Sequence, residues 1–115
     1  KFCQSRLSVA TIDQIGAAAL YSVEPKFYEE SKAEYRKRRD TVVQHLRKIP
    51  GVLVEEPMGA FYIMARLPVD DADKFQRWLL ESFEDGGDTV MFAPGASFYA
   101  TKGSGVNEIR IAYVL

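Results

Sequence analysis

The sequence contains almost none of the residues from which disulfides, zinc sites and histidine-based catalytic centres are built. Its 115 residues include a single cysteine, Cys3, and a single histidine, His45. One cysteine excludes a disulfide within the chain, and one cysteine with one histidine cannot assemble a zinc site of the usual kind. A histidine-based triad and a Gly-rich phosphate loop are absent as well. The residues alone therefore predict no metal site and no self-sufficient catalytic centre.

The chain also lacks a surplus of charge of either sign and a long apolar run. Fifteen basic residues against sixteen acidic ones leave a net charge of −1, which gives no electrostatic reason to expect a nucleic acid or an anionic membrane as partner. No stretch approaches the apolar length that spans a bilayer, and no signal-peptide pattern is present. Apolar residues make up 47% and charged residues 27%, the balance of a soluble globular protein. The expected compartment is the reducing cytoplasm.

Polar ends, which natural chains usually have, are missing too. The chain begins with Lys1-Phe2-Cys3 and no methionine, and it stops at Leu115 inside an apolar run. Its length is that of one ordinary domain with a real core. We therefore expect a single domain, residues 1–115, that is part of a longer protein.

Hydrophobic spacing and chain breakers predict the order helix, helix, strand, strand, helix, strand, strand. Thr11 is expected to cap the first helix, Pro25 to begin the second, and Asp70 or Asp71 to cap the third. This order predicts an α/β fold of the α+β sandwich kind, with a small mixed sheet and helices packed on one face. The predicted helices are 12–21, 26–48 and 72–83, and the predicted strands are 52–54, 59–67, 89–92 and 106–115. The expected buried positions of the second helix are Tyr28, Tyr35, Val42, Leu46 and Ile49, and those of the third are Phe75, Leu79 and Phe83.

One charged residue, Arg110, interrupts the apolar run of the last predicted strand. With a side-chain period of two, it shares a face with the small Ala112, whereas Ile109, Ile111 and Tyr113 share the other face. A guanidinium stays charged in proteins, and its planar fork suits a carboxylate or phosphate held by two parallel hydrogen bonds. The alternative is an edge strand whose arginine points to water. The strand by itself favours that alternative, because charged residues are seldom buried.

Three short motifs follow one another along the chain, and they reverse this preference. They are Pro57-Met58-Gly59-Ala60-Phe61-Tyr62, Ala93-Pro94-Gly95-Ala96-Ser97-Phe98 and Asn107-Glu108-Ile109-Arg110-Ile111-Ala112-Tyr113. In this order and spacing they resemble the C-terminal small domain of class I, fold-type I aminotransferases, which use pyridoxal phosphate, and most closely the aspartate aminotransferase group. The resemblance covers nearly the whole chain. It implies that residues 1–24 form the interdomain joint and first helix, that residues 25–115 form the body of the small domain, and that the large domain, which binds pyridoxal 5'-phosphate, is absent.

The resemblance also implies roles in substrate binding. Arg110 matches the arginine that grips the α-carboxylate of the amino or 2-oxo acid, and Gly59 and Phe61 belong to the strand and loop that close over the substrate. Phe98 would shape the turn beside it. Arg6 lies about where one branch of the family carries an arginine that reads the distal carboxylate from the neighbouring subunit of a dimer. For Arg6, a structural salt bridge or a surface charge is the alternative.

The family's Schiff-base lysine, its phosphate-binding residues and the aspartate that faces the pyridine nitrogen have no matching motif here. The resemblance implies a homodimeric transaminase as the parent enzyme, with aspartate and 2-oxoglutarate as the first choice of substrates and aromatic or other acidic substrates as the alternative. The chain alone would be inert, because pyridoxal chemistry needs that lysine. Two alternatives stay open. One is a free-standing small α/β module that binds a carboxylate, or regulates, without chemistry, and the other is an interaction domain that uses the slim helix at Gly16-Ala17-Ala18-Ala19 as a dimer surface.

Overall fold

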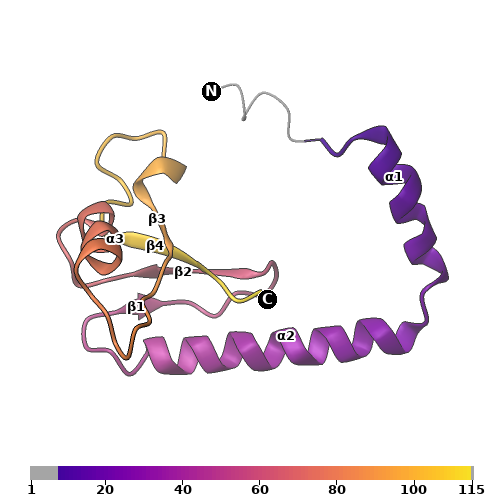
Figure 1. Ribbon diagram of the computed structural model, residues 1–115, viewed down its shortest axis with the longest axis horizontal. Coiled ribbons are helices and arrows are strands. Elements are labelled where there is room, and N and C mark those ends of the chain that lie inside the picture. The colour runs from indigo at the N-terminus through magenta and orange to yellow at the C-terminus, as the bar shows by residue number, and fades with distance from the viewer. Residues whose placement is uncertain (1–7, 115) are drawn as a thin grey trace. The chain divides into compact units, whose positions relative to one another are not determined.

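In the computed structural model, residues 8–114 are described (Figure 1). The chain divides into two units, Lys1–Lys32 and Ala33–Leu115. The division falls within one long helix, α2 (Pro25–Leu46). Each unit is described below by itself.

The first unit holds an alanine-rich helical segment and the beginning of α2. The helix α1 (Thr11–Ala17) continues directly into the 3-10 helix η2 (Ala18–Ser22). The expectation that Thr11 caps α1 was wrong: the helix begins one residue earlier than predicted, so Ala10 is the N-cap and no side chain caps it. The Tyr28 hydroxyl donates a hydrogen bond of 2.6 Å to the Leu20 carbonyl and so ties η2 to the first turns of α2.

The second unit is built on a four-stranded sheet with the strand order β1-β2-β4-β3. Every neighbouring pair is antiparallel. The α+β fold is therefore confirmed, but the expected mixed sheet was wrong, because β4 lies between β2 and β3 and runs opposite to both. The elements of this unit after α2 are β1 (Leu53–Val54), β2 (Tyr62–Arg66), α3 (Ala72–Glu81), β3 (Ala93–Pro94), the 3-10 helix η3 (Ala96–Phe98) and β4 (Glu108–Ala112).

Alternation along β2 separates a buried face of the sheet from an open one. Ile63 and Ala65 are buried, whereas Tyr62, Met64 and Arg66 are exposed. Side chains of α2 and α3 pack with the buried face, which agrees with the prediction of helices on one face. The core cluster consists of Val43, Leu46, Ile63, Ala65, Leu67, Ala72, Ile109 and Tyr113.

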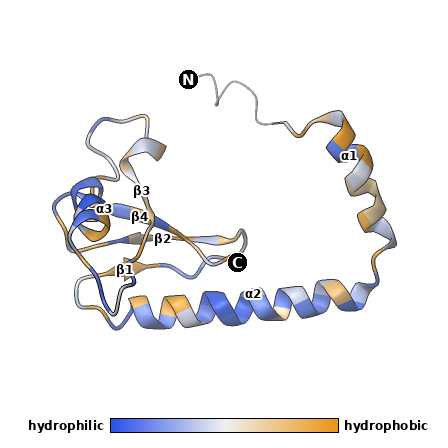
Figure 2. Cartoon of the chain, viewed as in Figure 1, coloured by the Kyte–Doolittle hydropathy of each residue, from blue (hydrophilic) through white to orange (hydrophobic). Residues whose placement is uncertain are grey.

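The two long helices of this unit match their predictions in part. The middle of α2 is hydrophilic, and apolar residues return toward the end that leads to β1 (Figure 2). Val43 and Leu46 are the buried residues of α2, whereas Ile49 lies beyond its end and is exposed. Asp71 caps α3 as predicted, since its carboxylate accepts a hydrogen bond of 3.0 Å from the Lys74 amide. No helix among residues 8–114 is long and apolar enough to cross a membrane.

Residues 89–92, predicted as a strand, pair with α3 instead of with the sheet. The buried side chain of Gln76 accepts a hydrogen bond of 2.6 Å from the Phe92 amide, and its Nε2 donates one of 3.4 Å to the Val90 carbonyl. The Thr89 hydroxyl donates to the Leu79 carbonyl at 2.6 Å. The two Gln76 bonds occupy backbone groups of Val90 and Phe92 that a strand would pair with a neighbour, and the strand begins only at Ala93.

The turn from β3 into η3 has room for glycine alone. A Cβ built on Gly95 would lie 2.8 Å from both the Cβ and the carbonyl oxygen of Glu108 on β4. The Gly95 amide donates to that same carbonyl at 2.7 Å, which fixes this close approach. We expect Gly95→Ala to destabilise the fold by about 1–3 kcal/mol, the usual cost of overpacking.

Urea unfolding of the chain with Gly95→Ala, followed by circular dichroism, measures this cost. Gly59→Ala is the matched control in the same unit, because no atom lies within 4 Å of a Cβ placed there. The Gly95 variant should unfold at a clearly lower urea concentration than the Gly59 variant. Equal midpoints would show that β3 and β4 separate without cost.

Candidate functional site

Arg110 lies in the interior of the sheet. On β4 it is opposite Met64 of β2 on one side and opposite Ala93 of β3 on the other. The alternative of an edge strand was therefore wrong. The predicted faces are confirmed by the burial of Ile109 and Tyr113 on the helix side, whereas Arg110 is only partly buried on the open side.

The guanidinium of Arg110 lies close to two aromatic rings. Its Cζ is 5.2 Å from the ring centroid of Tyr62, at the start of β2, and 4.8 Å from that of Phe98, at the end of η3. Such contacts stabilise a cation by about 0.5–1 kcal/mol each at exposed sites. A guanidinium held in this way is suited to bind a carboxylate through two hydrogen bonds.

No protein carboxylate occupies this edge in the part of the chain that the structure describes. The ion pairs of residues 8–114 involve lysines and arginines of α2 and α3, and Arg110 is not among them. The neighbours of Arg110 on the open face include Tyr62, Met64 and Phe98, which are uncharged and each more than a third exposed. Glu108 shares this face two positions earlier on β4, but its carboxylate accepts a hydrogen bond from the Tyr99 hydroxyl and forms no ion pair with Arg110. The guanidinium is therefore without an ion-pair partner among residues 8–114.

Phe98 is held in place by contacts of the residue that follows it. The Tyr99 hydroxyl donates a hydrogen bond to the Glu108 carboxylate at the start of β4, which raises the pKa of Tyr99. The Tyr99 ring also lies against Gly105, where a Cβ would come within 2.5 Å of it. Gly105 has a φ of 69°, a backbone conformation that glycine adopts without strain. These contacts fix η3 to β4, so they keep the Phe98 ring beside Arg110.

The structure places the other predicted site residues in different surroundings. Gly59 lies in an open turn before β2, with space around its Cα. Phe61 is half exposed, and its ring packs against Tyr35 of α2, with centroids 4.9 Å apart, on the side of the sheet that the helices cover. The structure therefore does not bring Phe61 to the guanidinium. Arg6 lies outside the described residues.

The aromatic neighbour that the sequence analysis missed is Tyr62. Period-two alternation places Tyr62 and Met64 on one face of β2. In the observed register Tyr62 is opposite Ala112, so it lies diagonally across from Arg110, within reach of an aromatic ring. The alternation of β2 indicates which face Tyr62 occupies. It places Tyr62 beside Arg110 only once β2 and β4 are known to be neighbours.

Two hollows of the surface lie away from Arg110. One of about 820 Å³ runs along α2 and is lined mainly by charged and polar side chains, including Arg36, Lys37 and Arg47. Another, of about 630 Å³, lies in the first unit between η2 and the start of α2. Arg110 lines neither of these two, and with Tyr62 and Phe98 it forms a patch on the open face of the sheet.

A comparison with known protein families decides what this patch belongs to. The profile of the family "Aminotransferase class I and II" matches residues 3–113. The chain belongs to the class I and II aminotransferase family. The resemblance seen in its three motifs is thereby confirmed.

Individual aminotransferases resemble the chain over most of its length. An aspartate aminotransferase of Pyrococcus horikoshii is 40% identical over 110 residues, which cover 92% of this chain and 26% of that protein. An alanine aminotransferase from Pyrococcus furiosus has a similar structure, with a TM-score of 0.68 and 25% identity over 97% of this chain and 27% of the other. A kynurenine aminotransferase of Pyrococcus horikoshii, solved in complex with PMP, gives a TM-score of 0.64 and 26% identity over 78% and 21%. The chain spans about a quarter of the length of the aspartate aminotransferase that it matches.

Proposed function

We propose that this chain is the C-terminal small domain of a pyridoxal-phosphate-dependent transaminase, and that its Arg110 holds the α-carboxylate of the amino or 2-oxo acid. The position of the Arg110 guanidinium carries this proposal: it lies beside Tyr62 and Phe98, and no carboxylate of the described chain pairs with it. Family membership supports it, since an amino acid and a 2-oxo acid that exchange an amino group each have an α-carboxylate. Residues 1–24 would serve as the joint to the large domain.

Pyridoxal phosphate supplies the electron sink for the chemistry of this family. The residues of this chain do not fit as its holder. The four strands contain no lysine that could bind it covalently. We therefore assign the cofactor to the part of the parent enzyme outside this chain, and we assign no catalytic residue to the chain.

The work of this domain is to bind and orient the acid. Two charge-assisted hydrogen bonds from Arg110 would hold the carboxylate plane in one orientation, and such bonds contribute about 1.5–3 kcal/mol each. The rings of Tyr62 and Phe98 lower the local dielectric constant and so strengthen this pair. Closure of the small domain would bring Gly59 and its turn over the substrate and exclude water from the cofactor. Arg6 would read a distal carboxylate from the neighbouring subunit of a cytoplasmic homodimer.

Aspartate is the amino donor that we propose, with 2-oxoglutarate as acceptor. The support is the 40% identity with an aspartate aminotransferase. The structural relatives act on alanine and kynurenine by their names, at lower identity. The full-length enzyme should therefore show its highest kcat/KM for aspartate among aspartate, alanine and kynurenine, each measured with 2-oxoglutarate. A higher value for alanine or kynurenine would contradict the aspartate assignment and leave the transaminase assignment intact.

A further inference from the structure

The backbone of the turn before β2 is held by polar contacts. We call residues Glu56–Phe61 the 56–61 turn. Within it the Met58 side chain is 94% exposed, and Gly59 has no neighbour within 4 Å of a Cβ position. Ala60 has a φ of 64°, in the left-handed region that a residue with a Cβ rarely adopts. Such a conformation persists only where the surrounding structure fixes it.

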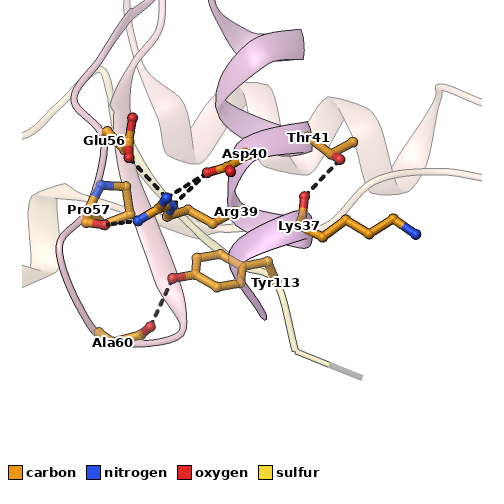
Figure 3. Close-up of polar contacts among 8 residues, drawn as sticks. All are labelled: Lys37, Arg39, Asp40, Thr41, Glu56, Pro57, Ala60 and Tyr113. Atoms are coloured by element: carbon orange, nitrogen blue, oxygen red, sulfur yellow. Dashed lines mark hydrogen bonds and ion pairs between the residues drawn. The ribbon is translucent and has the colours of Figure 1, made fainter. Parts of the chain in front are cut away.

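The first anchor of the turn is Arg39 of α2 (Figure 3). Its side chain is only 19% exposed. One guanidinium nitrogen, Nη2, lies 3.0 Å from the Glu56 carboxylate, and Nη1 donates to the Pro57 carbonyl at 3.3 Å. Nε donates to the Asp40 carboxylate at 2.8 Å, which orients the fork. The same guanidinium therefore binds a side chain and a backbone carbonyl of the turn.

The second anchor is Tyr113, directly after β4. Its hydroxyl donates to the Ala60 carbonyl at 2.8 Å (Figure 3). Its amide donates to the Phe61 carbonyl at 3.0 Å. The Tyr113 side chain is buried, with 8% exposure. Tyr113 thus holds the strained residue of the turn. It stands three positions after Arg110, on the same segment of backbone.

We infer that Arg39 and Tyr113 are positioning residues for substrate binding. They set the shape of the 56–61 turn and couple it to the strand that carries Arg110. The inference rests on the proposed function, which brings this turn over the substrate. Neither residue touches the substrate in this account. Both act through the turn, so their loss should raise KM for the amino acid and loosen the turn.

The test uses the full-length enzyme with Arg39→Gln, Arg39→Lys and Tyr113→Phe. Lys37→Gln is the control, because it also removes a positive charge from α2 but has no hydrogen bond or ion pair to the turn. Amide hydrogen exchange of residues 58–63 and the KM for aspartate are measured for each. Tyr113→Phe removes one hydroxyl and should raise exchange and KM about two- to tenfold, the effect of one lost hydrogen bond. Lysine should not rescue Arg39, since a point charge cannot replace the fork.

The inference is supported if amide exchange is faster and KM is higher in both Arg39→Gln and Tyr113→Phe, while both quantities are unchanged in Lys37→Gln. Unchanged exchange in Tyr113→Phe and Arg39→Gln would overturn it, and so would faster exchange with an unchanged KM. Arg110→Lys is measured alongside, because it tests the carboxylate-binding role of Arg110 separately from the positioning role of Arg39 and Tyr113. If that variant also leaves kcat/KM unchanged, the carboxylate assignment fails, and the anchors serve stability alone.

Discussion

Full-length enzyme with Arg110→Lys is expected to lose at least about tenfold in kcat/KM for aspartate, which corresponds to about 1.4 kcal/mol of transition-state binding. Lysine keeps the positive charge, but it cannot form two parallel hydrogen bonds to one carboxylate. It also lacks the planar group that the rings of Tyr62 and Phe98 hold. Arg110→Ala removes the charge as well, and we expect it to cost about 2–5 kcal/mol, or roughly thirtyfold and upward.

The matched control for this prediction is Arg66→Lys. Arg66 is an exposed arginine on β2, on the same open face of the sheet, but it has no aromatic partner among the described cation–ring pairs. Its replacement should change kcat/KM by no more than about twofold, since surface substitutions cost within about 0.5 kcal/mol. A loss below tenfold for Arg110→Lys, or an equal loss in both variants, would argue against a two-bond grip on the carboxylate.

The second large effect is a complete loss of activity in the isolated chain. The purified 115-residue protein should show no imine absorbance with pyridoxal phosphate and no transamination of aspartate. The reason is chemical: the reaction needs a lysine that forms the imine and groups that hold the cofactor, and we assign both to the rest of the enzyme. The full-length enzyme, assayed in parallel, is the positive control. A measurable turnover by the chain alone would show that it contains its own catalytic centre.

Local patterns were sufficient to predict most elements and the faces of the last strand. Asp71 was expected as a helix cap, and its carboxylate does bind the first turn of α3. The alternation of Ile109, Arg110 and Ile111 predicted which side chains enter the core. The helix cap and the strand alternation each depend on residues that are close in sequence. Both can therefore be predicted without knowledge of the fold.

Features that depend on distant residues were not predictable. Residues 89–92 have the composition of a strand, but Gln76, more than ten positions earlier, takes up their backbone groups. The interior position of β4 depends on β3 pairing with its far side. The stacking of Arg110 joins residues from three separate elements, β2, η3 and β4. The three motifs gave the right family, but only the fold shows Tyr62 beside the guanidinium and Phe61 turned away from it.

We propose above that Arg110 holds the substrate's α-carboxylate. A crystal structure of the full-length enzyme with bound aspartate or a dicarboxylate analogue tests this role most directly. We predict two nitrogen atoms of the Arg110 guanidinium at about 2.7–2.9 Å from the two oxygens of that carboxylate. The rings of Tyr62 and Phe98 should remain beside the guanidinium. An α-carboxylate bound by other residues, with Arg110 turned to solvent, would contradict the claim.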